Sequence, residues 1–540
     1  MNTKRIALSM GLLFVLLVSA CGGAAATEAP APAQPQNYSP HEAPVATEAP
    51  AMPEAPSNSY VPSAKDSSSP NPSNAGAPNQ NAGQDPQDMF FEDYGVNPSV
   101  DTEDDHLSTF ALDVDTGSYT IMRNYLSEGN LPPSDSVRVE EYINYFNQTY
   151  PNPPRHQAFG ITIDGAPSPF TETERYQMLR VGIQGYQVPD EDRKDANLVF
   201  VIDVSGSMDM DNRLGLVKRS LELLVEQLDY RDTVGIVVYG TEARVVLEPT
   251  SGSDKDAILS AIYSLHPEGV TNAEAGIRLG YRMAMREFKN DGINRVILCS
   301  DGVANFGNTE SEVILSEIRG HVEEGVTMTT IGFGMDNYND VLMEQLADNG
   351  NGFYTYVDDM REAKRLFIDN LTSTLQTIAM DAKVQVDFNP EVVMRYRLVG
   401  FENRAVADDD FRDNSVDAGE LGAGHSVTAL YEVKLYPEAY GKIATVYLRW
   451  EDPDTRSVTE LSQDFYANQL ARDFREADAY FQRTVVVAEY AEILKKSYWA
   501  EDGSLEHVYR EAQRVYDSMP RERDMEEFVD LVGQALRYSE

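Results

Sequence analysis

The middle of the chain, residues 196–378, predicts an α/β fold with a doubly wound, mostly parallel sheet. The first observation is the apolar run Leu198–Ile202, which is typical of a strand buried on both faces of a sheet. The second is the stretch Leu214–Leu228, whose apolar residues recur at helical spacing on one face. Because such strands and helices keep alternating over the region, we expect helices on both faces of a parallel sheet.

The same two patterns predict the remaining elements of this region. Short apolar runs predict strands, and apolar residues at a period of 3.6 predict helices. The expected strands are residues 234–239, 244–247, 295–299, 327–333 and 353–357. The expected helices are residues 256–265, 273–288, 310–322, 341–347 and 361–375.

Residues 89–195 predict an N-terminal flanking region of mixed α and β structure. Pro132-Pro133 separates two helical stretches, because proline interrupts a helix. Strands are expected at 109–114, 160–164 and 178–184, and helices at 118–127 and 136–146.

Two further regions follow the α/β domain. Residues 379–466 predict a small β domain with strands at 383–388, 427–435 and 442–450. Residues 467–540 have helical periodicity, with Val485–Val487 at positions that we expect to be buried. A helical segment with so thin a core of its own is expected to pack on a neighbouring region.

The first 21 residues predict a lipoprotein signal peptide. Lys4 and Arg5 supply its positive start, and residues 6–18 supply an apolar segment too short for a comfortable membrane span. Val18-Ser19-Ala20-Cys21 resembles the bacterial lipobox, which implies cleavage before Cys21 and acyl chains that anchor the protein. The expected location is the cell envelope, on the outer face of the cytoplasmic membrane or on the outer membrane. The alternative is an ordinary secretory signal with an unmodified cysteine.

Residues 22–88 predict a disordered tether, because they are rich in Ala, Pro, Ser and Asn and offer little apolar surface to bury. The whole chain of 540 residues has 44 Lys and Arg against 88 Asp and Glu, a formal charge of −44. That charge excludes nucleic acid as an expected partner and favours basic or metal-bridged ones. Its simplest effect is solubility.

Five oxygen-bearing side chains follow predicted strands or precede a predicted helix. Asp203, Ser205 and Ser207 come directly after the first buried strand, Thr271 stands before a helix, and Asp301 follows another strand. In an open α/β sheet, ligands bind at the carboxyl ends of the strands, so we expect these residues to converge. Hydroxyls and carboxylates favour a hard divalent cation, Mg²⁺ first and then Mn²⁺ or Ca²⁺. Helix capping by serine and aspartate is the structural alternative.

This pattern, Asp203-x-Ser205-x-Ser207 with Thr271 and Asp301-Gly302, resembles the metal-ion-dependent adhesion site (MIDAS) of von Willebrand factor type A (VWA) domains. The resemblance implies a Rossmann-like fold over residues 196–378. It also implies that the two serines, and the threonine directly or through water, hold the metal, while the aspartates act mostly through water. A partner's Asp or Glu completes the coordination. Neighbouring Gly206 and Gly302 are expected to let the backbone turn sharply.

The resemblance extends more loosely to uncharacterised bacterial lipoproteins, through a flank of the type Leu107–Thr116. We therefore expect a membrane-anchored binding module that captures a protein partner, and we expect it not to be an enzyme. A metal-assisted hydrolase would use the open coordination position, but His266 is the only histidine in the three loops. A structural envelope protein is the third hypothesis.

Two other motifs have simpler interpretations. Asp115-Thr116-Gly117-Ser118 matches the aspartic-protease signature, but the sequence lacks the second copy that such chemistry needs. We interpret it as a turn that caps a helix. Cys299 is expected to be a buried strand residue rather than a nucleophile.

Overall fold

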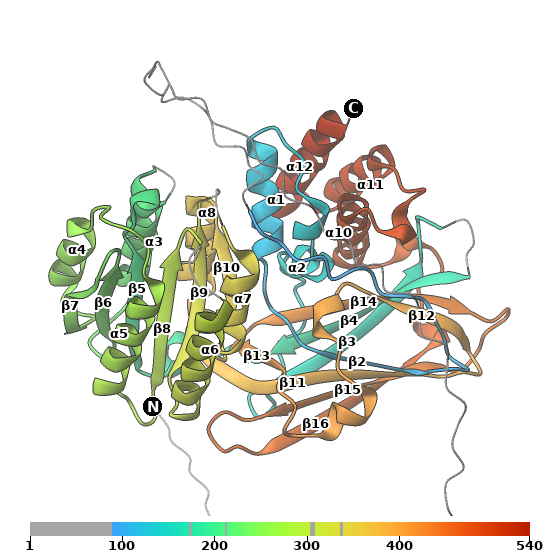
Figure 1. Ribbon diagram of the computed structural model, residues 1–540. Coiled ribbons are helices and arrows are strands. Elements are labelled where there is room, and N and C mark those ends of the chain that lie inside the picture. The colour runs from blue at the N-terminus through green and yellow to red at the C-terminus, as the bar shows by residue number, and fades with distance from the viewer. Residues whose placement is uncertain (1–88, 172–174, 211–212, 303–307, 335–337, 540) are drawn as a thin grey trace, which may run out of the picture. The chain divides into compact units, whose positions relative to one another are not determined.

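The computed structural model describes residues 89–171, 175–210, 213–302, 308–334 and 338–539 (Figure 1). The predicted signal peptide with Cys21 and the predicted tether, residues 22–88, lie outside the described residues. All described residues belong to one compact unit, residues 81–540. In the described part of the chain, every helix is too short or too polar to cross a membrane.

The predicted α/β domain contains a six-stranded sheet in the order β10-β9-β8-β5-β6-β7. Neighbouring strands are parallel except at the edge, where β7 runs antiparallel to β6. The strands are β5 Ala196–Asp203, β6 Thr233–Tyr239, β7 Ala243–Ser251, β8 Ile293–Ser300, β9 Thr327–Phe333 and β10 Tyr354–Val357. All residues of the central strands β5 and β8 are buried, so the predicted fold class is confirmed.

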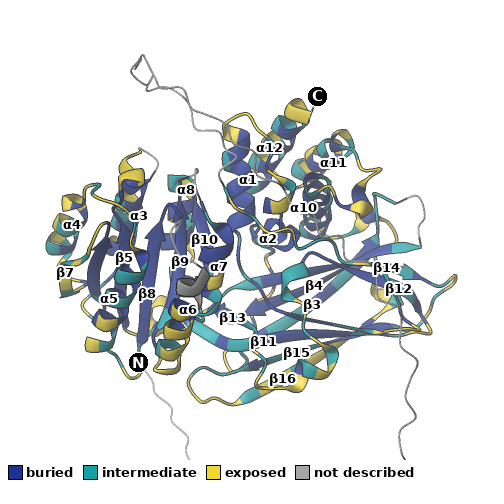
Figure 2. Ribbon diagram, viewed as in Figure 1, coloured by how far each residue is buried: buried dark blue, intermediate teal, exposed yellow. Residues whose placement is uncertain are grey.

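Helices cover both faces of this sheet (Figure 1). They are α3 Leu214–Gln227, α4 Lys255–Ser264, α5 Ala273–Arg286, α6 Asn308–Glu323, α7 Asp340–Asp348, α8 Met360–Lys364 and α9 Leu371–Leu375. Alternate residues of β5 face opposite sides, so Phe200 packs with α3 while Val201 packs with α5. Figure 2 shows the strands of the sheet as buried and shows exposed residues on the outer faces of α3, α4 and α5.

The single helix predicted at 361–375 is divided in the structure. A π-helical turn, Arg365–Asp369, separates α8 from α9. There, the Asn370 amide donates to the Arg365 carbonyl at 2.9 Å, five residues back. A π-helical turn contains one more residue than an α-helical turn. The pattern of apolar residues does not predict this extra residue, because it changes the backbone hydrogen bonds and not which side chains are apolar.

Strands from both sides of the α/β domain build a β-sandwich. One sheet has the order β1-β12-β14-β4-β3, and the other has the order β13-β11-β15-β16 with β2 paired to β11. The strands before the α/β domain are β1 Val100–Asp101, β2 Leu107–Ala111, β3 Phe159–Pro167 and β4 Tyr176–Gly185. Those after it are β11 Thr377–Phe388, β12 Val393–Val399, β13 Gly419–Gly422, β14 Ser426–Leu435, β15 Lys442–Glu451 and β16 Val458–Tyr466. The α/β domain is thus inserted between two halves of the sandwich.

A helical layer completes the molecule. It consists of α1 Gly117–Ser127, α2 Val139–Asn144, α10 Ala479–Lys495, α11 Leu505–Ser518 and α12 Arg523–Ser539. Val485–Val487 of α10 are buried in one core with Tyr119 of α1 and Tyr142 of α2. The prediction that the helical end packs on a neighbouring region is therefore confirmed (Figure 1).

A helix does begin within Asp115–Ser118, as predicted, but the predicted side-chain cap is wrong. The N-cap residue of α1 is Thr116, and it makes no side-chain capping hydrogen bond. The Asp115 carboxylate instead accepts a hydrogen bond at 2.9 Å from the backbone amide of Tyr354, far away in the sequence. The local sequence around Asp115 favours a helix cap. In the structure, the carboxylate of Asp115 instead accepts a hydrogen bond from a residue that is distant in the sequence.

Candidate metal centre

The five predicted site residues lie on three loops of the α/β domain. Asp203 is the last residue of β5, and Ser205 and Ser207 stand in the loop that follows it. Asp301 follows β8, the parallel neighbour of β5, and Thr271 stands two residues before α5. The carboxyl ends of β5 and β8 lie at the same sheet edge, where ligands of open α/β sheets bind.

Hydrogen bonds join the three loops at this edge. The Glu268 amide donates to the Val204 carbonyl at 2.5 Å, and the Gly206 amide donates to the Gly269 carbonyl at 3.2 Å. These two bonds hold the loop of Thr271 against the loop of the serines. The Ser300 hydroxyl donates to Asp203 Oδ2 at 3.2 Å, which holds the end of β8 against the same loop.

The site is most buried at its base and opens toward solvent. Asp203, Ser205 and Asp301 are buried, Thr271 is half-buried and Ser207 is exposed. The two carboxylates therefore form the base of the site, and a hydroxyl lies at its opening. An ion held between them could accept one further ligand from outside.

The serine hydroxyls have the spacing of neighbouring metal ligands. Ser205 Oγ and Ser207 Oγ are 3.0 Å apart. Adjacent ligands of an octahedral Mg²⁺, each at about 2.1 Å, lie about 3 Å apart. Asp203 Oδ1 accepts from the Ser205 amide at 2.7 Å, which fixes the carboxylate beneath the hydroxyls. The oxygen donors present therefore fit a small, hard divalent cation.

The structure adds one residue that the sequence did not predict for this site. Arg213, just before α3, donates from Nη1 to Asp301 Oδ2 at 2.7 Å and to the Ser207 carbonyl at 2.8 Å. This guanidinium fixes one aspartate and one serine together. No local pattern indicates this pairing, because the two charged residues are 88 positions apart.

The two aspartates share an environment that disfavours their negative charge. Burial, followed by the charge of Asp301, raises the pKa of Asp203 to about 6. Burial also raises the pKa of Asp301, although Arg213 opposes that shift. A divalent cation close to both carboxylates would stabilise their ionised forms.

Glycines with positive φ shape the loops of the site. Of the two glycines predicted to allow a sharp turn, only Gly302 is one of them. Gly302 has a φ of +122°, which favours glycine, and Gly269 in the Thr271 loop has a φ of +77°. Gly206 is not among the described residues with positive φ, and a Cβ there would meet its nearest atom at an ordinary 3.6 Å. The expectation that Gly206 is needed for a sharp turn is therefore wrong.

Three families match successive parts of this chain. They are described as von Willebrand factor (residues 85–180), von Willebrand factor type A domain (residues 197–369) and Uncharacterized protein YfbK, C-terminal (residues 373–537). VWA domains are usually non-catalytic interaction modules and commonly bind a divalent cation.

Individual proteins and solved structures are also similar to parts of this chain. Uncharacterized protein YfbK of Escherichia coli is 35% identical over 80% of this chain and 78% of its own length. Human inter-alpha-trypsin inhibitor heavy chain H3 is 26% identical over 38% of this chain and 22% of its own length. A solved structure, the von Willebrand factor type A protein from Catenulispora acidiphila, is 15% identical, with a TM-score of 0.41, over 64% of this chain and 82% of that one. The chain belongs to the family of the uncharacterised protein YfbK and carries a VWA domain over residues 197–369.

Proposed function

We propose that this chain is a membrane-anchored interaction module that captures a protein partner through a divalent cation at the candidate metal centre. The observation that carries the proposal is the pair of serine hydroxyls 3.0 Å apart above the buried Asp203 and beside Asp301. Ser205, Ser207 and Thr271 would hold the ion, and the two aspartates would balance its charge. Mg²⁺ suits this set best, with Mn²⁺ and Ca²⁺ as further candidates.

The ligand chemistry supports binding of a carboxylate. Hydroxyl ligands add no negative charge, so an ion held largely by them keeps its attraction for an anionic oxygen. The exposed Ser207 marks the side from which that oxygen would approach. The formal charge of the chain is −44, so an acidic partner would be repelled elsewhere. The partner that fits is a protein that presents one Asp or Glu amid neutral or basic contacts.

The anchoring part of the proposal rests on the sequence. The lipobox-like Val18–Cys21 would place the lipid on Cys21, and residues 22–88 would let the folded unit reach away from the membrane. The protein would then reside in the cell envelope, on the outer face of the cytoplasmic membrane or on the outer membrane.

The test is crosslinking in cells, followed by capture of the identified partner by the purified full chain. Capture should require Mg²⁺ and should be lost in excess EDTA. Asp203→Ala should abolish it, whereas Asp256→Ala, at an exposed position on α4, should leave it unchanged. Loss of a buried carboxylate–cation contact is expected to cost about 2–5 kcal/mol.

Thr271→Ala separates partner binding from ion binding. The resemblance to VWA domains implies that this residue acts when the partner is engaged, so the variant should weaken capture more than it weakens Mg²⁺ affinity. Equal capture in EDTA, or capture unchanged in both Asp203→Ala and Thr271→Ala, would contradict the proposal. Turnover of a substrate from a hydrolase panel would favour an enzyme instead.

A further inference from the structure

A buried tyrosine hydroxyl lies beside the candidate metal centre. Tyr239 is the last residue of β6, and its register partner on the neighbouring parallel strand β5 is Asp203. The Tyr239 side chain is fully buried, and its hydroxyl has no hydrogen-bond partner among the described residues. A buried polar group without a partner costs folding free energy, so this hydroxyl calls for an explanation.

The Tyr239 side chain and the Asp203 side chain point to the same face of the sheet. Side chains alternate along a strand, and Val201, two residues before Asp203, packs in the same core as Tyr239, on the side of α5. Burial, followed by the charge of Asp203, raises the pKa of Tyr239 well above its usual value. The hydroxyl therefore lies close to the Asp203 carboxylate, and it is protonated, so it can donate a hydrogen bond.

Helix α5 holds the Tyr239 ring in place. A Cβ added at Gly276 of α5 would lie 2.7 Å from a ring carbon of Tyr239, so the ring packs directly on this helix. The Tyr239 carbonyl accepts from the Val204 amide at 2.9 Å, which ties the end of β6 to the loop after β5. Because α5 is the helix that follows Thr271, Tyr239 lies between two of the three loops of the site.

The Asp203 carboxylate has acceptor capacity for a further donor. Its Oδ1 accepts from the Ser205 amide at 2.7 Å, and its Oδ2 accepts from the Ser300 hydroxyl at 3.2 Å. An ionised carboxylate offers about four acceptor positions. Arg213 pairs with Asp301, and no arginine or lysine forms an ion pair with Asp203 in the described part of the chain. The charge of Asp203 is therefore stabilised by neutral donors.

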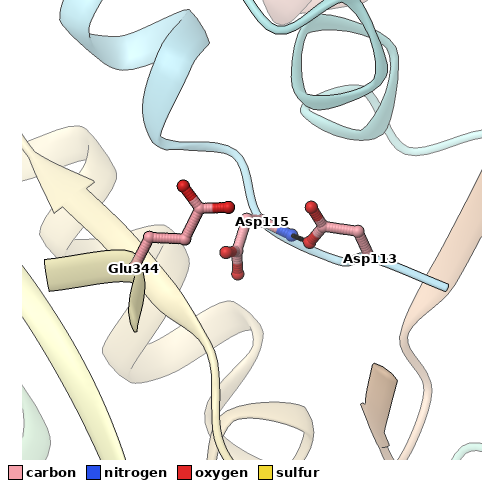
Figure 3. Close-up of side chains that lie close together, drawn as sticks. All are labelled: Asp113, Asp115 and Glu344. Carbon is pink, nitrogen blue, oxygen red and sulfur yellow. Dashed lines mark hydrogen bonds between the residues drawn. The ribbon is translucent and has the colours of Figure 1, made fainter. Parts of the chain in front are cut away.

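A second group of buried carboxylates shows the contrasting arrangement. Asp113, Asp115 and Glu344 lie close together (Figure 3). There the chain supplies its own cation. Arg404 Nε is 3.1 Å from Asp113 Oδ2, and Arg404 Nη2 is 2.8 Å from Glu344 Oε1 and 3.8 Å from Asp115 Oδ2. Asp203 has no such guanidinium, so neutral donors and a bound ion are left to stabilise its ionised form.

We propose that Tyr239 is a positioning residue of the candidate metal centre, whose hydroxyl donates a hydrogen bond to the Asp203 carboxylate when a divalent cation is bound. The cation favours ionised Asp203, and an ionised carboxylate is a stronger acceptor than a protonated one. The hydrogen bond would hold Asp203 at the base of the site, and Tyr239 would not touch the ion itself. This inference rests on the proposed metal centre, and it is independent of the partner and of the anchor.

The test is Mg²⁺ titration calorimetry on the full chain and on Tyr239→Phe, which removes the hydroxyl and keeps the ring. The Mg²⁺ affinity should fall about tenfold, the effect of one hydrogen bond to a charged group. Tyr281→Phe is the matched control. The Tyr281 hydroxyl, on α5, is also buried without a hydrogen-bond partner among the described residues, and burial alone raises its pKa. This control should bind Mg²⁺ as the parent chain does.

Thermal unfolding separates a positioning role from a purely structural one. Without Mg²⁺, Tyr239→Phe should melt at or above the temperature of the parent chain, because the unpartnered hydroxyl stabilises nothing there. With Mg²⁺ below saturation, it should gain less in melting temperature than the parent chain. A Tyr239→Phe chain that melts lower without Mg²⁺ and binds Mg²⁺ with the affinity of the parent would overturn the inference, since the hydroxyl would then serve the fold alone.

Asp203→Ala distinguishes failure of this inference from failure of the metal centre. If Asp203→Ala loses Mg²⁺ binding and Tyr239→Phe keeps the parent affinity, the metal centre stands and the role of Tyr239 is wrong. If the parent chain binds no Mg²⁺, or Asp203→Ala binds it equally well, the metal centre and this inference fail together.

Discussion

At the scale of single residues, the candidate metal centre combines groups that are costly to bury with groups that are not. Asp203 and Asp301 are buried carboxylates, and Arg213 offsets only part of their charge. Ser205 and Ser207 are neutral and lie above them. Buried anions beneath neutral hydroxyls are what a cation with an open ligand position requires.

The residue types of this site could be predicted from the sequence, but their electrostatic partner could not. Asp203, Ser205 and Ser207 stand within five positions after an apolar strand, so the predicted strand and the Asp-x-Ser-x-Ser spacing together locate them. Arg213 was not predicted, because its ion pair with Asp301 depends on two loops meeting in the fold.

The glycines at the site give a prediction about backbone strain. Gly302→Ala should lower the free energy of unfolding by about 1–3 kcal/mol, because alanine is strained at positive φ. Gly206→Ala is the matched control and should change it by less than about 0.5 kcal/mol. Urea unfolding of the purified chains measures both. Similar losses in the two variants would contradict the assigned backbone conformations.

At the scale of elements, most strands were predicted, and β1, β12, β13 and β16 were missed. β9 begins and ends at its predicted residues, Thr327 and Phe333. β16, Val458–Tyr466, was not predicted, because it pairs only with β15 and its side chains are mostly exposed and polar. β13 has only four residues. Periodicity therefore misses a strand such as β16, of which little is buried on a regular face.

The turn between β13 and β14 gives a prediction about pH. Burial, followed by the charge of Arg295, lowers the pKa of His425 from 6.5 to about 4. Between these values the unfolded chain binds a proton that the folded chain does not. The stabilising contribution of neutral His425 is therefore fully present above pH 6.5. As the pH falls toward 4 this contribution is lost, and the free energy of unfolding decreases by up to about 1.4 kcal/mol per pH unit.

His425→Gln should remove this part of the acid sensitivity, because glutamine does not titrate. His156→Gln is the matched control, since His156 is exposed. Urea unfolding at pH 7.5 and at pH 5 should show a smaller loss for His425→Gln than for the parent. An equal loss in all three chains would show that His425 titrates normally in the folded protein.

At the scale of the whole molecule, the VWA domain is inserted into a sandwich whose strands come from both sides of it. β2 pairs with β11, and β4 pairs with β14, although each pair is separated by more than 200 residues of sequence. Predicted strands carry no information about such distant pairing, so the sequence predicts these parts separately. The structure joins them in one unit with the VWA domain.

The predicted anchor gives a prediction for the whole molecule in the cell. Cys21→Ser should release the protein from membranes into the soluble fraction of the envelope, because the acyl chains would have no sulfur to join. Fractionation and immunoblotting measure the distribution, and Ser19→Ala within the same signal is the control. Equal partition of Cys21→Ser and the parent chain would contradict lipid anchoring.

The account rests most on a divalent cation at the candidate metal centre, which Mg²⁺ titration calorimetry tests directly. The full chain should bind one Mg²⁺ that Asp203→Ala does not bind. The circular dichroism spectrum of the variant should remain that of the parent, because Asp203 is the last residue of β5 and its side-chain hydrogen bonds, within the described part of the chain, are to Ser205 and Ser300 at the strand ends. A folded Asp203→Ala chain with unchanged Mg²⁺ affinity, or a parent chain that binds no Mg²⁺, would contradict the assignment.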